Sequence, residues 1–333
     1  MKIWIPSIKT GSGSDVYMIR LAESLRNLGL TVELQWFPHV FEFCPLLLRA
    51  IKPPADTDLI FVNSWTAIGF TQHKIPVVTC VHHCVHDPDY RPFKSTAQAI
   101  YHRLLIFPYE KAGLQAATQV VVGSEFTQRK VQECFNIKAQ LITYSVDSEK
   151  FHPIQKDKNN KRPFKLLFIG NQSKRKGFYL LADIMQQLGE QYTLNYTSGL
   201  RTLEGETHIP YAQALGKLSD KQLIAAYQQA DALLFPTRYE GFGYAVAEAM
   251  ACGLPVISSD CSSLPELVEE GQGGFLCPPD SVDDFVAKIQ QLESSTALCE
   301  QMGAYNRDKA VSTYQPKRMG LAYIQLFKQL CHV

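Results

Sequence analysis

The sequence predicts an α/β protein built from two doubly wound domains with parallel sheets. Strand-like and helix-like segments alternate through the first third of the chain, and the same alternation restarts after a polar interruption. Most of the strand-like segments are continuous apolar runs, which is typical of parallel sheets covered by helices on both faces. The length of 333 residues also favours two domains, because one hydrophobic core seldom supports so long a chain.

The expected first domain spans residues 1–155. Its first strand is KIWIP, and a turn rich in glycine and serine leads to an amphipathic helix with Val16, Ile19, Ala22 and Leu25 on one stripe. Further strands are expected at TVELQW, DLIFV, PVVTCV, TQVVVG and AQLITY. This order of elements predicts a doubly wound sheet.

Apolar residues nearly vanish between Ile154 and Lys165, which predicts a linker between domains. The expected second domain spans residues 163–315 and contains a helix from Phe178 to about Leu188. Its strands are expected at LLFIG, TLNYT, ADALLFP and LPVISS.

The last segment, residues 316–333, is expected to be a helix that could pack back on the first domain. Its apolar side chains follow one helical face: Met319, Tyr323, Phe327 and Leu330. Two doubly wound domains that face each other form a cleft between the carboxyl ends of their strands, where such sheets bind ligands.

Composition excludes several classes of protein. Hydrophobic residues make up 46% of the chain and charged residues 20%, which argues against disorder. The net charge of +1 gives no electrostatic argument for a nucleic-acid partner. The nine cysteines include no CxxC pair and indicate reduced thiols in a cytoplasmic protein. Neither a signal peptide nor a transmembrane helix is expected, because the start lacks a suitable apolar core and no apolar run reaches about 18 residues.

The most informative stretch is RYEGFGYAVAEAMACGLPVISSD. Gly241 and Gly243 allow a tight turn, and a helix is expected from Gly243 to about Ala251. The amides at the start of that helix would favour an anion such as phosphate. Glu240 in the loop and Glu248 in the helix could then hold the two hydroxyl-bearing ends of a nucleotide sugar.

These residues resemble the signature of retaining glycosyltransferases of family 4, which have the GT-B fold of two Rossmann-like domains facing across a cleft. Further stretches resemble the same family in the same order along the chain: GSGSDVYMIRLAESLRNLGLTVEL, SVDSEKFHP, FIGNQSKRKGFYLL and LPELVEEGQGGFLCPP. Together they cover most of the chain.

The resemblance implies a donor site for a UDP- or GDP-linked sugar, with no other cofactor. In the family the first glutamate holds hydroxyls of the donor sugar and the second holds the ribose, which assigns these roles to Glu240 and Glu248. Backbone amides near the diphosphate are implied for Phe242, Gly243 and Tyr244. The base is expected to meet the backbone around Gly216 and Leu218.

The stretch SKRKGF places three cations before an expected helix. Because cations oppose the positive end of a helix dipole, an anion is expected among them. Arg175 could bind two oxygens of a diphosphate and Lys176 could act as a point charge. The resemblance assigns the family's lysine to Lys176, whereas Asn171 replaces an arginine that many members carry. A solubilising charge run is the alternative.

The loop TGSGSD does not predict a nicotinamide site. Val16 stands where the dinucleotide-binding fingerprint has its last glycine, and no acidic residue ends the second strand. The resemblance implies instead that the loop lines the cleft near the donor phosphates, with Ser12, Gly13 and Ser14 as candidates. A plain turn between strand and helix is the alternative.

The stretch CVHHCVHDP contains two cysteines and three histidines. Alternate residues of an extended strand lie ~6.6 Å apart and cannot converge on one zinc ion, so no metal site is predicted, although a compact loop leaves zinc open. The resemblance implies an active-site histidine at the end of this strand, either His82 or, as the second choice, His83. The alternative is a histidine whose ring only forms hydrogen bonds at the end of the strand and has no role in catalysis.

The expected function is therefore metal-independent transfer of a hexose from a nucleotide diphosphate sugar to a hydroxyl of a glycan or lipid-linked acceptor, with retained configuration. Two other functions stay open, a nucleotide-sugar epimerase of the same fold and a non-catalytic nucleotide-sugar-binding subunit. The aromatic and basic segment from Tyr90 to Leu114 and the segment FEFCPLLLRAIKPP could touch the inner face of a membrane peripherally. Core helices with charged outer faces are the alternative.

Overall fold

The computed structural model describes residues 1–155, 162–197 and 208–332, which form two compact units. Unit 1 comprises Met1–Ser145 together with the chain from Pro316 onward, and unit 2 comprises Val146–Gln315. Residues 156–161 of the expected linker lie outside the described residues. The units divide after Ser145, earlier than the domain boundary expected at residue 155.

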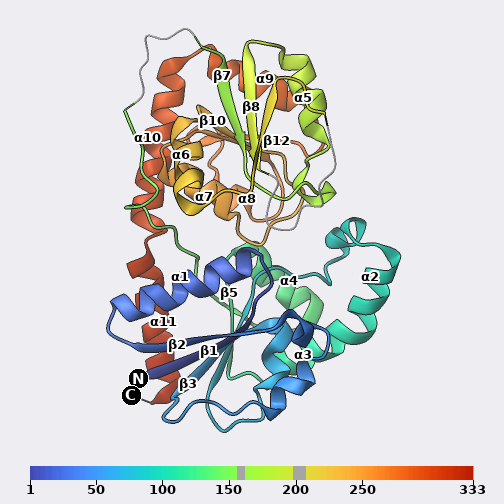
Figure 1. Ribbon diagram of the computed structural model, residues 1–333, viewed down its shortest axis with the longest axis vertical. Coiled ribbons are helices and arrows are strands. Elements are labelled where there is room, and N and C mark those ends of the chain that lie inside the picture. Colours follow the sequence, from blue (N-terminus) through green and yellow to red (C-terminus); the bar gives the residue numbers. More distant parts are fainter. Residues whose placement is uncertain (156–161, 198–207, 333) are drawn as a thin grey trace. The chain divides into compact units, whose positions relative to one another are not determined.

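Unit 1 contains a parallel sheet of six strands in the order β2-β1-β3-β4-β5-β6 (Figure 1). Its strands are β1 (Lys2–Ile8), β2 (Thr31–Phe37), β3 (Leu59–Asn63), β4 (Val77–Val81), β5 (Gln119–Val122) and β6 (Gln140–Leu141). The expected strand AQLITY is thus reduced to two residues. The order of the strands changes direction between β1 and β3, which is the switch point where such sheets bind ligands.

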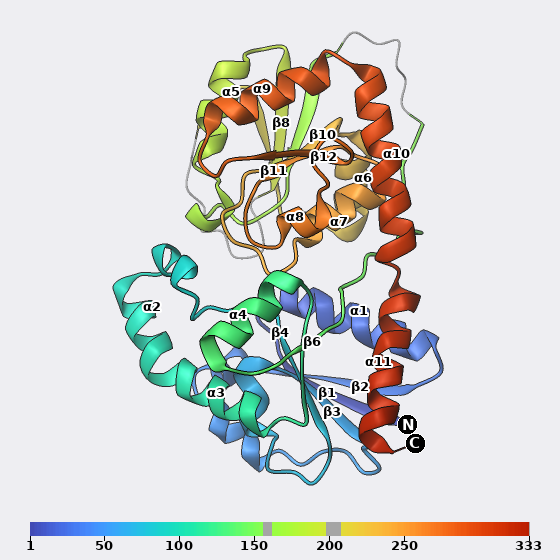
Figure 2. The same cartoon turned by 180° about the vertical axis from the view of Figure 1, so that it is seen from behind.

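Helices cover both faces of this sheet (Figure 2). The helices of unit 1 are α1 (Gly13–Asn27), α2 (Thr96–Tyr101), α3 (Phe107–Ala116), α4 (Glu125–Phe135) and α11 (Pro316–Cys331), of which α2 stands away from the sheet. Short 3-10 turns are η1 (His39–Glu42), η2 (Pro45–Ala50), η3 (Ser64–Gly69) and η4 (Pro88–Phe93), and η5 (His102–Ile106) is a π-helical turn between α2 and α3.

The helix α11 packs against α1 within unit 1. The hydroxyls of Tyr17 and Tyr323 hydrogen-bond each other, and Gly320 faces Ser24 so closely that a Cβ there would lie 2.4 Å from its Oγ. This packing explains why the stripe predicted for α1 was wrong at Ile19, which is 41% exposed. The sheet and α11 cover the face that carries Tyr17 and Leu21, and Ile19 lies outside it.

Unit 2 contains a second parallel sheet of six strands, in the order β12-β11-β10-β7-β8-β9. Its strands are β7 (Phe164–Phe168), β8 (Tyr192–Thr197), β9 (Ala212–Gly216), β10 (Ala232–Phe235), β11 (Val256–Ser259) and β12 (Gly274–Cys277). The switch point lies between β7 and β10, which pair directly through Leu166 and Ala232.

The helices of unit 2 are α5 (Leu180–Leu188), α6 (Asp220–Gln229), α7 (Tyr244–Ala251), α8 (Leu264–Leu267), α9 (Val282–Glu293) and α10 (Thr296–Thr313). The 3-10 turn η6 (Lys174–Lys176) precedes α5, so the helix expected from Phe178 begins two residues later. No helix formed by the described residues is both long and apolar enough to cross a bilayer.

Candidate functional site

The switch point of unit 2 carries the charged residues that the sequence singles out. The loop after β7 leads into η6, which contains Arg175 and Lys176, and the loop after β10 carries Glu240. Since β7 and β10 are neighbours and parallel, their carboxyl ends bring both loops to the same edge of the sheet.

Close packing holds the η6 turn against the end of β10. Ser173 caps η6 by accepting a hydrogen bond from the Lys176 amide, and Gly177 ends it with a φ of +69°. A Cβ at Gly177 would lie 1.8 Å from the Pro236 carbonyl oxygen, so no side chain fits there. The glycine of the stretch KRKG therefore allows the cations to approach the loop of Glu240.

Glu240 is buried and binds both cations. Its Oε1 lies 2.6 Å from Lys176 Nζ and 3.2 Å from Arg175 Nη1, and it accepts a hydrogen bond of 2.9 Å from Thr237 Oγ1. Burial raises the pKa of Glu240, but the charges of Lys176 and Arg175 outweigh it, so the pKa lies below its ordinary value. The anion that the sequence predicts among these cations is present within the protein as Glu240 itself.

Hydroxyl groups that the sequence analysis did not select hold the loop of Glu240 in place. Ser262 Oγ accepts a hydrogen bond of 3.0 Å from the Glu240 amide, and Ser263 Oγ lies 3.2 Å from the Glu240 carbonyl oxygen. Thr237 is fully buried and also reaches the Arg175 carbonyl oxygen at 3.1 Å. The only sequence signal for them is their position beside the glutamate motif and after the next strand.

The helix α7 places the second glutamate in the interior of unit 2. Gly243 is the N-cap, has a φ of +98° and brings no side chain to cap the amides of the first turn. Glu248 is buried, and its Oε2 accepts a hydrogen bond of 3.0 Å from Tyr227 Oη of α6. Tyr227 is a further residue that the sequence analysis missed.

The other donor-site candidates of unit 2 are Phe242, Tyr244, Gly216 and Leu218. Phe242 is buried, with its ring 5.5 Å from that of Tyr244. Gly216 ends the edge strand β9 with a φ of +66°, and Leu218 follows it half-buried. Among the described residues, no hydrogen bond joins Gly216 or Leu218 to Glu240.

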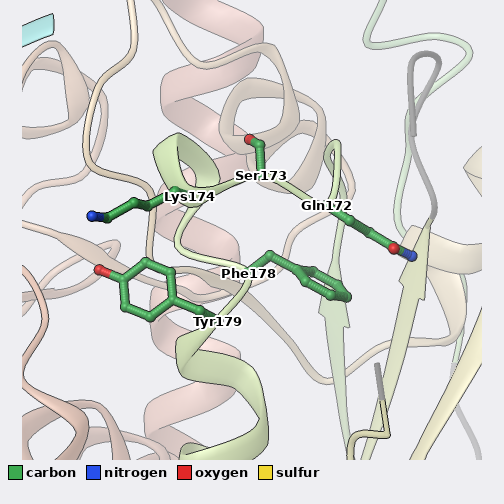
Figure 3. A pocket seen from close by; sticks show the side chains of 5 residues that line it. All are labelled: Gln172, Ser173, Lys174, Phe178 and Tyr179. Carbon is green, nitrogen blue, oxygen red and sulfur yellow. The ribbon is translucent and has the colours of Figure 1, made fainter. Parts of the chain in front are cut away.

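A pocket of about 330 Å³ lies beside the η6 turn. Figure 3 shows the side chains that line it: Gln172, Ser173, Lys174, Phe178 and Tyr179. Lys174 is exposed and lines this pocket, whereas Arg175 and Lys176 contact Glu240. The three cations of SKRKGF therefore divide between two environments.

The candidates of unit 1 lie after β1 and β4. Gly13 and Ser14 begin α1, and the Ser12 hydroxyl caps this helix by accepting a hydrogen bond from the Ser14 amide. The carboxylate of Asp15 accepts hydrogen bonds from the amides of Thr10 and Gly11. The loop thus carries its own anion at the start of the helix.

His82 directly follows β4 and is surrounded by aromatic rings. Its Nδ1 lies 2.6 Å from Tyr144 Oη, and its ring centroid is 4.9 Å from that of Tyr17. Burial lowers the pKa of His82 to about 4, against an opposing effect of Asp15. The imidazole is therefore neutral near pH 7, as the predicted role requires.

The rest of CVHHCVHDP is held by contacts within unit 1. The ring of His83 lies against Tyr90, with centroids 5.5 Å apart, while His86 Nε2 lies 3.0 Å from Glu110 Oε2. The buried Asp87 pairs with Lys130 at 3.2 Å. Within the described ranges, no group of three or more His, Cys, Asp and Glu side chains is arranged to hold a metal ion.

Two family descriptions match this chain in adjacent segments. Residues 149–309 match the family described as Glycosyl transferases group 1, and residues 33–149 match the one described as Glycosyltransferase Family 4. Together the two segments extend over most of both units.

Curated relatives give the same result. The chain is 29% identical over 244 residues to the O-antigen chain mannosyltransferase B of Escherichia coli. This alignment covers 66% of this chain and 60% of that protein. It is 26% identical over 299 residues to the sulfoquinovosyl transferase SQD2 of Arabidopsis thaliana, covering 85% of this chain and 56% of the relative. The chain thus spans little more than half the length of these relatives.

Solved structures share the fold at low sequence identity. Sucrose-phosphate synthase from Thermosynechococcus elongatus superposes with a TM-score of 0.84 at 20% identity over 98% of both chains. Anabaena HepE, in complex with UDP and glucose, superposes with a TM-score of 0.79 at 16% identity over 99% of this chain and 100% of HepE. With the two family matches and the glutamate signature, these likenesses show that the chain has the GT-B fold and belongs to glycosyltransferase family 4.

Proposed function

We propose that the protein transfers a hexose from a nucleotide diphosphate sugar to an acceptor hydroxyl, with retained anomeric configuration. The observation that carries the proposal is the contact of Lys176 and Arg175 with Glu240 at the switch point of unit 2. A cationic pair and a buried carboxylate side by side match the two ends of a sugar diphosphate, whose phosphates are anionic and whose sugar carries hydroxyls.

The charges suit the bond that must break. Cleavage of the sugar–phosphate bond builds negative charge on the leaving diphosphate and positive charge on the sugar ring. Lys176, Arg175 and the first amides of α7 would stabilise the leaving group. Because these groups supply positive charge themselves, the proposed mechanism is independent of a metal ion.

Glu240 is proposed to bind the donor sugar and not to attack it. Its Oε1 already accepts hydrogen bonds from Lys176, Arg175 and Thr237, which lowers its nucleophilicity. The leaving phosphate oxygen is proposed to take the acceptor's proton on the same face of the sugar. His82, neutral near pH 7, would hydrogen-bond a hydroxyl of the donor sugar.

The donor is proposed to be linked to UDP or GDP. The structural relative HepE is described in complex with UDP and glucose, which supports a nucleotide sugar. A thermal-shift screen with UDP- and GDP-linked sugars would identify the base, because a ligand that binds only the folded state raises the melting temperature. The acceptor is proposed to be a glycan or a lipid-linked saccharide, in line with the O-antigen mannosyltransferase among the relatives.

The test uses single variants in a transfer assay with the identified donor. Glu240→Ala and Lys176→Ala should each reduce transfer by about a hundredfold or more, because each removes a group aimed at the reacting bond. Glu293→Ala and Lys221→Ala, at exposed positions of unit 2, serve as matched controls and should transfer normally. Near-normal turnover in Glu240→Ala or Lys176→Ala would contradict the site.

The same assay without acceptor separates the other functions. An epimerase would convert the donor sugar by itself, and a binding subunit would bind the donor without turnover. Either outcome would replace the transferase proposal.

A further inference from the structure

Tyr144 lies beside His82 and has no role in the chemistry proposed above. Its side chain is 3% exposed, and its Oη lies 2.6 Å from His82 Nδ1 and 3.4 Å from Cys80 Sγ. A distance of 2.6 Å is at the short end of the range for a hydrogen bond. The phenol of Tyr144 therefore bonds directly to one nitrogen of the histidine that the sequence singles out.

Packing within unit 1 holds the ring of Tyr144 in place. The ring of the fully buried Tyr17 lies against it, with centroids 4.3 Å apart. A Cβ at Gly123 would lie 2.4 Å from Tyr144 Cε1, so the ring fills the space that a side chain at this position would need. Because these contacts hold the ring, the position of its hydroxyl is set before a ligand binds.

The direction of the hydrogen bond follows from the strength of the donors and acceptors. The Tyr144 hydroxyl can donate its proton to His82 Nδ1 or to Cys80 Sγ. The imidazole nitrogen is the stronger acceptor, since a thiol sulfur accepts hydrogen bonds only weakly. Burial raises the pKa of the Cys80 thiol to about 12, so the thiol keeps its proton and can donate it to Tyr144 Oη. The favoured arrangement thus has Cys80 donating to Tyr144 and Tyr144 donating to His82.

A hydrogen bond accepted at Nδ1 places the proton of the neutral imidazole on Nε2. His82 Nε2 is buried and has no hydrogen-bond partner among the described residues, although the residue as a whole is only half-buried. A buried N–H group without a partner is unfavourable. Nε2 is therefore the atom of this ring that can gain a hydrogen bond when a ligand binds.

We propose that Tyr144 is a positioning residue that holds His82 as the tautomer protonated on Nε2, so that this N–H donates a hydrogen bond to an oxygen of the bound sugar. The identity of the ligand rests on the proposed function, whereas the tautomer depends only on contacts within unit 1. An N–H donor at this position recognises a lone pair, which a hydroxyl oxygen of a hexose supplies.

The experiment is ¹⁵N nuclear magnetic resonance of the histidine side chains in the full chain, near pH 7 and without ligand. The protonated and the bare nitrogen of a neutral imidazole resonate far apart, and His82→Gln identifies the signals of His82. In the wild type Nε2 should be the protonated nitrogen. Tyr144→Phe removes only the hydroxyl, so both resonances should move toward intermediate values as the two tautomers exchange.

Two further variants separate the hydroxyl of Tyr144 from its surroundings. Tyr323→Phe removes another buried hydroxyl of unit 1 and, as the matched control, should keep the wild-type signals of His82. Gly123→Ala keeps the Tyr144 hydroxyl but displaces its ring, and should change the His82 signals as Tyr144→Phe does. Circular dichroism melting must show that the variants are folded.

Sugar transfer provides the second measurement. Tyr144→Phe should lower kcat/KM for the donor about tenfold, which corresponds to one lost hydrogen bond, and Tyr323→Phe should transfer like the wild type. A wild-type His82 protonated on Nδ1, His82 resonances that Tyr144→Phe leaves unchanged, or normal transfer by Tyr144→Phe would overturn the proposal. Since the spectra need no substrate, a wild type that transfers no sugar would contradict the proposed function and not the tautomer.

Discussion

The two units place different chemistry at the carboxyl ends of the same kind of sheet. In unit 2 the switch point gathers opposite charges, and Glu240 keeps its charge because Lys176 and Arg175 touch it. In unit 1 His82 follows β4, one strand away from the switch point between β1 and β3, and burial among aromatic rings lowers its pKa so that it is neutral near pH 7. Burial acts on both groups. The two cations in contact with Glu240 outweigh it, whereas the weaker effect of Asp15 on His82 does not.

The largest expected effect comes from breaking the charged cluster of unit 2. Lys176→Met should reduce the free energy of unfolding by about 4 kcal/mol, because it leaves the buried Glu240 with a single cation. The double variant Lys176→Met/Glu240→Gln should regain most of that loss, since neither charge is then buried alone. Urea unfolding of the two single variants and the double variant measures this coupling. Additive losses would show that the two side chains do not interact.

The next effect sharpens the contrast with unit 1. The pKa of His82 is about 6.5 in the unfolded chain and about 4 in the folded one, so the unfolded chain binds more protons between these values. The contribution of His82 to the free energy of unfolding should therefore be constant above pH 6.5, fall by about 3 kcal/mol as the pH drops to about 4, and level off below.

The variant His82→Gln isolates this contribution, because the pKa of His102 is also lowered to about 4 by burial. Urea unfolding at pH 7, 5.5 and 4.5 should show a weaker pH dependence in His82→Gln than in the wild type. An unchanged pH dependence in His82→Gln would mean that His82 titrates alike in both states.

The smallest of the three effects concerns Thr237, whose hydroxyl supports both Glu240 and the η6 turn. Thr237→Val keeps the shape and removes the hydroxyl, and should cost about 2 kcal/mol because the hydrogen bond to a carboxylate is lost. Thr237→Ser keeps the hydroxyl and should lose less. Thermal melting measures the stability of both variants, and calorimetric titration with the nucleotide sugar should show weaker donor binding in Thr237→Val. Equal behaviour of the valine and serine variants would exclude the hydroxyl as the cause.

Much of the fold could be predicted because most strands have a local sequence signal, a continuous apolar run. The run PVVTCV, for example, ends where β4 ends. The helix α11 was likewise predictable from Met319, Tyr323 and Phe327, which are all buried. The short β6 was not, because a two-residue edge strand depends on its neighbour β5 and not on its own composition.

The candidate site was predictable only as separate motifs. The sequence marks SKRKGF and EGFG, and it even indicates that an anion belongs among the cations. It does not show that Glu240 is that anion, because the contact depends on the pairing of β7 with β10. These two strands are far apart in the sequence, since 63 residues lie between Phe168 and Ala232. Thr237, Ser262 and Tyr227 could not be predicted as site residues for the same reason. Their role depends on the side chains and backbone groups that they contact and not on their residue type.

The place of α11 has a consequence for the order in which the chain can fold. Unit 2 is continuous in sequence, whereas unit 1 needs the helix that begins at Pro316 to cover Tyr17 and Leu28 of the first hundred residues. During synthesis from the N-terminus, Met1–Ser145 therefore cannot complete the folding of unit 1 until the helix that begins at Pro316 has been made. Unit 2 can be complete on the ribosome while the apolar face of α1 is still uncovered, so nascent chains that stall before Pro316 are expected to be clients of chaperones.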